Sequence, residues 1–242
     1  RAPHHNASTP ALVGGGRKAQ PGEISLAHHG VLFLDELPEF NRTTLEALRQ
    51  PLENGCVSIS RVNAHTTYPA DFQLIAAMNP CRCGHLGDPS RECPRAPRCA
   101  EEYQAKISGP LLDRIDIHIE VPAVSPWDLA GVKKGETSAA IRQRVIKARE
   151  IQTARFRQLG EKKLCTNAQL KGKLLEEVAA LDNDAKELLV TFADRNKLSA
   201  RAYHRTLRLA RTIADLQNES KILKLHIAEA LSYRPKLSSH RQ

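Results

Sequence analysis

The 242-residue sequence contains no glycine-rich phosphate-binding loop of the form G-x-x-x-x-G-K-[ST]. Its run Gly14-Gly15-Gly16-Arg17-Lys18 has the wrong spacing, and no strand is expected before it. Aromatic residues make up only 4% of the chain, no stretch approaches the roughly 18 apolar residues of a membrane-spanning helix, and no signal-peptide pattern opens the sequence. These absences lead us to expect a cytoplasmic protein of the α-rich or α/β class, with no membrane partner.

Positive charge is concentrated in the C-terminal part of the chain. Residues 1–132 carry 12 Lys and Arg against 15 Asp and Glu, whereas residues 133–242 carry 24 against 12. The net charge of the second part is therefore +12, against −3 for the first. Such an excess indicates a polyanionic partner, nucleic acid first; the alternative is a solvated helical surface rich in lysine and arginine.

Two apolar segments end in polar side chains that suit nucleotide chemistry. The segment 31–34 is followed directly by Asp35 and Glu36, and the segment 72–78 is followed by Asn79. We predict that both are buried parallel strands, whose carboxyl ends meet at the ligand-binding edge of an α/β sheet. An Asp at that edge holds Mg²⁺ and the adjacent Glu polarises an attacking water, which is the Walker B arrangement. The alternative is a strand followed by an ordinary acidic turn.

The stretch between these strands predicts a helix and a hairpin. Asn41 is expected to cap a helix that Pro51 kinks and Gly55 ends. Alternating residues over 57–68 then predict a short hairpin, with Arg61 near its tip.

A third strand is predicted over 115–121, and the turn-rich residues that follow it predict a linker. From Ser138 onward the apolar spacing is helical, with stripes that begin at Ile141 and Val145 and continue to a last helix near residues 221–233. The predicted fold class is α/β in residues 1–122, then a linker over 123–137 and an all-α domain over 138–236.

Four of the six cysteines lie within 19 residues, at Cys81, Cys83, Cys93 and Cys99. Dense thiols in a cytosolic chain are more often metal ligands than disulfides, and four thiolates suit structural Zn²⁺. Their irregular spacing leaves unligated thiols as the alternative. The histidine pairs, among them His4-His5, lack a spaced acidic or cysteine partner and are interpreted as surface or interface residues.

The ordered set of motifs resembles the AAA+ ATPases, and in particular the magnesium-chelatase-like ComM/YifB family. The resemblance covers nearly the whole chain and rests on four long runs: Pro-Gly-Glu-Ile-Ser-Leu-Ala-His (21–28), Gly-Val-Leu-Phe-Leu-Asp-Glu-Leu-Pro-Glu-Phe (30–40), Ala-Ala-Met-Asn-Pro-Cys (76–81) and Ile-Ser-Gly-Pro-Leu-Leu-Asp-Arg-Ile-Asp (107–116). It implies a partial P-loop AAA+ core, followed by an all-α lid domain.

The resemblance also implies a role for each matching residue. Asp35 helps to hold the Mg²⁺ of ATP, Glu36 is the base for hydrolysis, and Asn79 is sensor 1, which positions water. Arg114 matches the arginine finger that reaches the nucleotide of a neighbouring subunit, which implies a homo-oligomeric ring, usually a hexamer. Arg201 matches sensor 2 in the lid.

Two family elements are absent from these residues: the Walker A strand, loop and helix, and the N-terminal Lon-protease-like domain. Because the Walker A strand lies inside the AAA+ sheet, its absence leaves unpaired strand edges and an exposed apolar face. The chain opens with Arg1 rather than Met. We therefore expect a C-terminal fragment of a longer gene product that is inactive alone as an ATPase.

Three functions are weighed on this basis. The first is the C-terminal part of an ATPase that couples ATP hydrolysis to remodelling or branch migration of single-stranded or branched DNA in recombination and natural transformation. The hairpin at 57–68 lies where related proteins carry a pre-sensor hairpin, which makes Arg61 a candidate DNA contact; the alternative is a merely structural hairpin. The second is metal insertion into a porphyrin, as an ATPase subunit of a magnesium chelatase. The third is a catalytically dead nucleic-acid-binding or interaction module.

Overall fold

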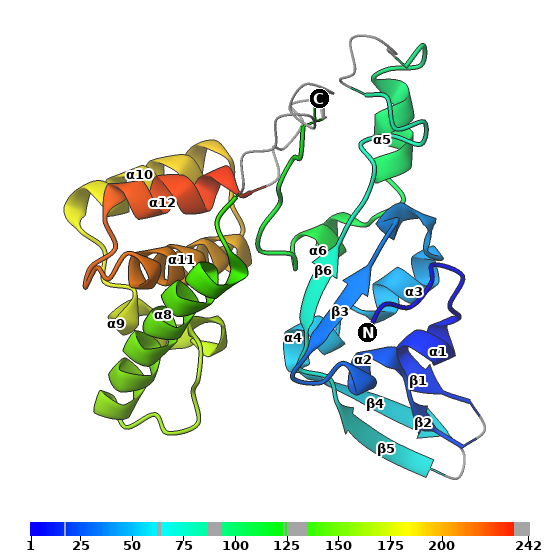
Figure 1. The fold of residues 1–242 in the computed structure, drawn as a ribbon, viewed down its shortest axis with the longest axis horizontal. Helices are drawn as coiled ribbons and strands as arrows, with labels where there is room; N and C mark the ends of the chain where they lie inside the picture. The colour runs from blue at the N-terminus through cyan, green and yellow to red at the C-terminus, as the bar shows by residue number, and fades with distance from the viewer. Residues whose placement is uncertain (17, 62–63, 87–92, 123, 125–134, 235–242) are drawn as a thin grey trace. The chain divides into compact units, whose positions relative to one another are not determined.

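The computed structural model describes residues 1–242 except 17, 62–63, 87–92, 123, 125–134 and 235–242 (Figure 1). The chain divides into two compact units, Arg1–Ile115 (unit 1) and Asp116–Gln242 (unit 2). Unit 1 is mixed α/β and the secondary structure described in unit 2 is helical.

A small parallel sheet lies at the centre of unit 1. β3 (Val31–Leu34) pairs with β6 (Gln73–Ala76) over their full lengths, from Val31 opposite Gln73 to Leu34 opposite Ala76 (Figure 1). On the other side of β3, the Arg1 backbone exchanges hydrogen bonds with Val31 and Phe33. β3 is therefore an inner strand, and both predicted parallel strands are present.

One face of this sheet is packed and the other is open. Leu32 and Leu34 of β3 are fully buried in a core formed with α1, α2, α3 and α6. The alternate residues point to the opposite face, where Val31, Phe33 and Ile75 are 41%, 37% and 44% exposed. The two strands are therefore buried on one face only, and the sheet has the exposed apolar face that the sequence led us to expect.

The other elements of unit 1 surround this sheet. They are α1 (Thr9–Val13), β1 (Gly14–Gly15), β2 (Gln20–Pro21), α2 (Glu23–Leu26), the 3-10 turn η1 (Leu37–Glu39), α3 (Arg42–Ala47), α4 (Pro51–Asn54), β4 (Cys56–Arg61), β5 (Ala64–Pro69), α5 (Arg98–Gln104) and α6 (Gly109–Leu112). β4 and β5 form the predicted antiparallel hairpin. The helix predicted after Asn41 is two helices: the Asn41 side chain caps α3, and Pro51 begins α4. A proline without an N–H suits a helix start better than an interior.

The third strand predicted over 115–121 is not formed. In unit 2 the segment after Asp116 is extended but belongs to no sheet, and its backbone contact runs from His118 N to Tyr233 O. Ile119 and Val121 are 69% and 84% exposed. A strand needs the edge of a neighbour to satisfy its backbone groups, and the described part of unit 2 offers none.

Unit 2 is built from helices around one hydrophobic core. The elements are α8 (Ser138–Gln158), η2 (Asn167–Gln169), α9 (Gly172–Val178), α10 (Asn183–Arg195), α11 (Ala200–Leu216) and α12 (Lys224–Ser232). The side chains of Thr137, Asp182 and Ser199 cap α8, α10 and α11. Among the described helices of the chain, none is both long and apolar enough to cross a bilayer.

The predicted apolar stripes of unit 2 are correct except in α8. Leu175, Leu189 and Leu207 are buried in the core as expected. Ile141 and Val145, however, are exposed, and α8 enters the core only through its second half, where Phe156 is 1% exposed.

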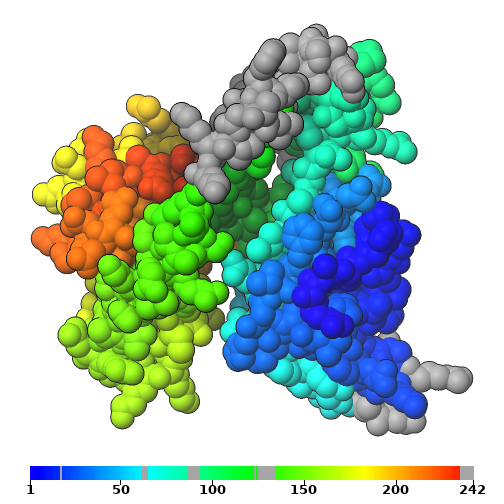
Figure 2. Space-filling model, viewed as in Figure 1, coloured from blue at the N-terminus to red at the C-terminus, as the bar shows by residue number. Residues whose placement is uncertain are grey.

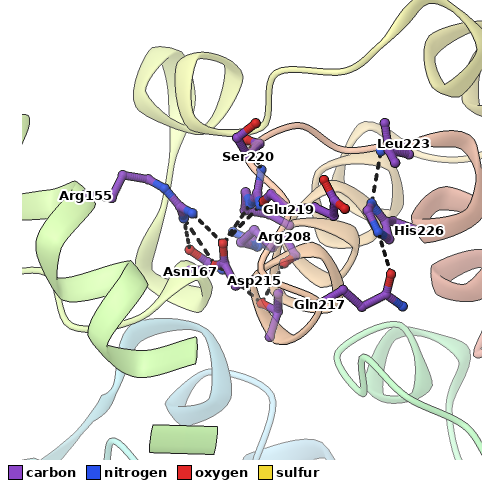
Figure 3. Close-up of polar contacts among 11 residues, drawn as sticks. Arg155, Asn167, Arg208, Asp215, Gln217, Glu219, Ser220, Leu223 and His226 are labelled. Carbon is purple, nitrogen blue, oxygen red and sulfur yellow. Dashed lines mark hydrogen bonds and ion pairs between the residues drawn. The ribbon is translucent and has the colours of Figure 1, made fainter. Parts of the chain in front are cut away.

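A buried ionic network ties α8, η2 and α11 together (Figure 3). Asp215 of α11 accepts hydrogen bonds from Arg155, Asn167 and Arg211, and its side chain is fully buried. Arg211 also donates to the backbone oxygens of Glu219 and Ser220, which follow the end of α11. Both buried charges are therefore paired, as burial requires.

Candidate active site and cysteine cluster

Two carboxylates stand where β3 ends. Asp35 and Glu36 are both exposed, and the Glu36 N–H donates to Asp35 Oδ1 at 2.9 Å. Glu36 has φ of +51°, in the left-handed region that non-glycine residues seldom occupy. This conformation turns the chain sharply after the strand.

Asn79 reaches the same edge of the sheet from β6. The ends of the two strands are joined by hydrogen bonds from Ala77 N to Leu34 O and from Leu37 N to Ala77 O. Asn79 follows two residues later and is exposed. Because β3 and β6 are parallel, their carboxyl ends, and with them Asp35, Glu36 and Asn79, lie on one side of the sheet.

His5 is a neighbour of this site that the sequence did not reveal. Its Nδ1 lies 3.1 Å from Glu36 Oε2. The N-terminal residues, dark blue in Figure 2, run over the surface of unit 1. The sequence pattern favours surface or interface histidines at His4-His5, and no spacing rule links a histidine to an acid so far along the chain.

Arg114 lies just beyond the C-terminal end of α6 and is held by several acceptors. Its guanidinium donates to Glu53 Oε2 at 2.6 Å, to Pro110 O at 2.6 Å and to Arg49 O at 3.1 Å. These three hydrogen-bond acceptors all belong to unit 1. Its side chain is 9% exposed and lines an open hollow together with Glu46, Arg49, Gln50, Glu53 and Asn54.

Two further residues expected from the sequence lie elsewhere. Arg201 is an exposed residue in the first turn of α11, in unit 2. Arg61 ends β4, where its backbone pairs with Ala64; its side chain lies outside the described part of the structure. The strand ends that precede Asp35, Glu36 and Asn79 are therefore adjacent, and the roles of these three residues and of the arginines stay predictions.

The four clustered cysteines converge in space. The sulfurs of Cys81, Cys83, Cys93 and Cys99 all lie within 4.8 Å of one another, and those of Cys81 and Cys83 are 3.2 Å apart. Burial raises the pKa of the Cys81 thiol, but hydrogen bonds from Cys83 and from the backbone amides of residues 84–86 outweigh it and lower that pKa to about 7. The Cys83 pKa is raised to about 11, since a hydrogen bond from the His85 amide is outweighed by its contacts with Cys81 and Cys93.

Comparison with known proteins identifies the family. The family model described as "Magnesium chelatase, subunit ChlI" matches residues 1–129, and its C-terminal companion matches residues 135–234. The chain is 50% identical to "Competence protein ComM" of Haemophilus influenzae over 97% of its own length and 44% of that protein. It is 47% identical to "Uncharacterized protein YifB" of Salmonella typhimurium over 97% of its length and 45% of that protein.

A "Magnesium-chelatase 67 kDa subunit" of Chlorobaculum parvum is more distant, at 32% identity over 28% of this chain and 11% of the relative. The chain spans less than half the length of its ComM and YifB relatives. With two family models covering most of its residues, the chain belongs to the magnesium-chelatase ChlI family, in its ComM/YifB group.

Proposed function

We propose that this chain is the C-terminal part of an AAA+ ATPase that couples ATP hydrolysis to the remodelling of DNA. The observation that carries the proposal is that Asp35, Glu36 and Asn79 follow the adjacent carboxyl ends of the parallel strands β3 and β6. Ligands of open α/β sheets bind at that edge, and phosphoryl transfer needs positioning and positive charge rather than covalent chemistry.

Each of these three residues has a separate task in hydrolysis. Asp35 offers the exposed carboxylate oxygens that Mg²⁺ prefers, and the metal ion supplies charge stabilisation to the phosphates. Glu36 accepts a proton from the attacking water, and His5 holds one of its oxygens. Asn79, with an amide that both donates and accepts, orients the same water.

The phosphate-binding loop is supplied by residues outside this chain. On one face of the β3–β6 sheet the side chains of Val31, Phe33 and Ile75 are exposed. Among the described residues, β6 also has a single strand partner. A further strand and helix would cover both features. We accordingly expect these 242 residues alone to show neither tight ATP binding nor hydrolysis.

Arg114 and Arg201 complete the proposed site in a ring. Arg114 acts on the nucleotide of the neighbouring subunit after it leaves Glu53, and Arg201 contacts the γ-phosphate from the lid domain. Positive charge at these places stabilises the transferring phosphoryl group. Because Arg114 would act on a neighbouring subunit, the proposed assembly is a ring of identical subunits, a homo-hexamer.

DNA is the proposed polymer substrate. The C-terminal residues 133–242 carry a net charge of +12, which suits a phosphate backbone. Arg61 is the last residue of β4 in the β4–β5 hairpin, and we propose that it contacts DNA. A relative's name includes the word competence, and competence is the capacity of a cell to take up DNA.

The test is ATP hydrolysis by the complete gene product, with and without single-stranded and branched DNA. We expect DNA to stimulate hydrolysis and Glu36→Gln to reduce kcat by about 10²–10⁴-fold. Glu187→Gln, at an exposed position in α10, is the matched control and should leave kcat unchanged. Hydrolysis that survives Glu36→Gln would contradict the assignment of the base.

A catalytically dead nucleic-acid-binding module is the second candidate, favoured by the missing phosphate-binding loop. It predicts salt-dependent DNA binding with no ATPase activity in the complete gene product. Metal insertion is the weaker alternative, because the chelatase relative matches only 28% of the chain. Chelatase activity with partner subunits and a porphyrin, without DNA stimulation, would favour it over the proposal.

A further inference from the structure

The four-cysteine cluster has the geometry of a site for a single metal ion. Zinc bound by four thiolates at about 2.3 Å in a tetrahedron places each pair of sulfurs about 3.8 Å apart. In this chain the sulfurs of Cys81, Cys83, Cys93 and Cys99 lie within 4.8 Å of one another. Small side-chain rotations would bring the four sulfurs to the spacing that zinc requires. We propose that these cysteines bind one structural Zn²⁺, a property that does not depend on the proposed ATPase function.

A role in the apolar core and a disulfide each suit the cluster less well than a metal ion does. Cys81 and Cys93 are buried, at 0% and 6% exposure, yet neither belongs to the hydrophobic core described for unit 1. They are therefore not simply small apolar residues of that core. A disulfide pairs only two thiols, whereas here four converge, and all six cysteines are free thiols.

The ligand set also favours zinc over other metals. Four thiolates in a tetrahedron select zinc or iron–sulfur chemistry, and exclude the oxygen-preferring Mg²⁺ and Ca²⁺. A multi-iron cluster needs its thiolates farther apart than a single ion does. The close approach of Cys81 and Cys83, at 3.2 Å, is therefore in keeping with one ion.

The surroundings of the sulfurs suit the charge of such a site. Zinc with four thiolates carries a net charge of −2. Backbone amides of residues 84–86 point to the Cys81 sulfur, and the amide of Arg95 points to that of Cys93. Gly84, with φ of +77°, makes the turn that aims the first set of amides. Such outer contacts stabilise thiolates in metal sites.

The proposed ion connects two segments that bear on the candidate active site. Cys81 and Cys83 follow Asn79 directly, whereas Cys99 lies in the first turn of α5. At the other end of α5, Gln104 donates a hydrogen bond to Pro80 O at 3.0 Å. A metal bound here fixes the first turn of α5 to the segment that follows Asn79, while the Gln104 hydrogen bond holds the last turn of α5 to the same segment.

Metal analysis of the purified chain tests the proposal. The protein is produced with zinc in the medium, moved into metal-free buffer and analysed by mass spectrometry of the elements. We expect about one zinc per chain. Replacing the native ion with Co²⁺ should give the intense visible absorption of a tetrahedral cobalt thiolate. Zinc binding should also slow amide exchange at Gly84 and in α5.

Matched variants separate this site from adventitious binding. Cys83→Ser changes an exposed ligand and should lose the zinc with little effect on the fold, as judged by circular dichroism. Cys165→Ser, an exposed cysteine outside the cluster, should retain it. Zinc retained by Cys83→Ser, iron in place of zinc, or a metal-free wild-type chain with four reactive cluster thiols would each overturn the proposal.

Discussion

His5 Nδ1 lies 3.1 Å from Glu36 Oε2, at the point where β3 ends. The backbone of Glu36 has a φ of +51°. This conformation costs free energy for any residue with a side chain. Unfavourable backbone geometry of this kind is often kept at functional sites. The pair therefore links the N-terminal segment to the proposed catalytic base.

We predict that His5→Ala in the complete, ATP-hydrolysing protein lowers kcat on the order of ten-fold, because the contact of His5 Nδ1 with the Glu36 carboxylate, which positions the proposed base, is lost. KM for ATP should change little, since His5 positions the base and does not contact the nucleotide. Steady-state kinetics measures both. His4→Ala is the control and should keep the wild-type kcat; an equal loss in both variants would indicate a structural effect.

Arg114 is predicted to act across a subunit boundary. Arg114→Ala and Glu36→Gln chains should each be nearly inactive in ATP hydrolysis. When mixed before assembly, they should regain a measurable part of the activity, because some interfaces then combine an intact base with an intact arginine. Activity of the mixture that stays at the level of the separate variants would show that Arg114 does not act in trans.

Asp215 is predicted to be essential for the stability of unit 2. Asp215→Asn leaves Arg155 and Arg211 without a carboxylate, and Arg211 is fully buried. Breaking a buried pair in this way costs about 3–5 kcal/mol of the free energy of unfolding. Urea denaturation followed by circular dichroism measures it. Glu187→Gln at an exposed position should change the same quantity by no more than about 0.5 kcal/mol.

His226 should make unit 2 sensitive to acid. Burial, and then the Arg211 charge, lower the pKa of His226 below its ordinary 6.5, although Asp182, Glu219 and Glu229 oppose this. Its Nδ1 accepts from Leu223 N at 3.0 Å, which requires the neutral ring. The folded protein therefore disfavours protonation, so this contribution to stability is complete above about pH 6.5 and is lost as the pH falls below it through the folded pKa.

Thermal unfolding between about pH 7.5 and pH 5, reported as Tm at each pH, measures this effect. His226→Gln should show a shallower fall of Tm with acidification than the wild-type chain. His204→Gln, on the partly exposed side of α11, should follow the wild-type curve. Parallel curves for wild type and His226→Gln would contradict the assignment.

Local signals in the sequence predicted much of this fold. Three of its features depend only on neighbours along the chain, and the structure has all three. They are the strand before Asp35, the helix cap at Asn41 and the hairpin of alternating residues. The helical spacing of unit 2 likewise placed most of its core residues. The cysteine cluster was found from the positions of four cysteines along the chain, and the structure brings their sulfurs together.

The failures involve partners distant in sequence. The segment after Asp116 has the apolar pattern of a strand but lacks a neighbouring edge, so its Ile119 and Val121 remain exposed. The exposure of Phe33 agrees with the apolar face expected from the absent Walker A elements, although the strand pattern alone predicts a buried residue. The His5–Glu36 contact and the Glu53 partner of Arg114 are tertiary pairs with no local signal.

The most direct test of the central claim is the reading frame that precedes Arg1 in the gene. If Asp35, Glu36 and Asn79 form a nucleotide site, that frame must encode a strand followed by G-x-x-x-x-G-K-[ST]. Sequencing the genomic DNA upstream should find this motif in frame. A stop codon before Arg1 with no such motif would contradict the account, because these residues would then have no nucleotide on which to act.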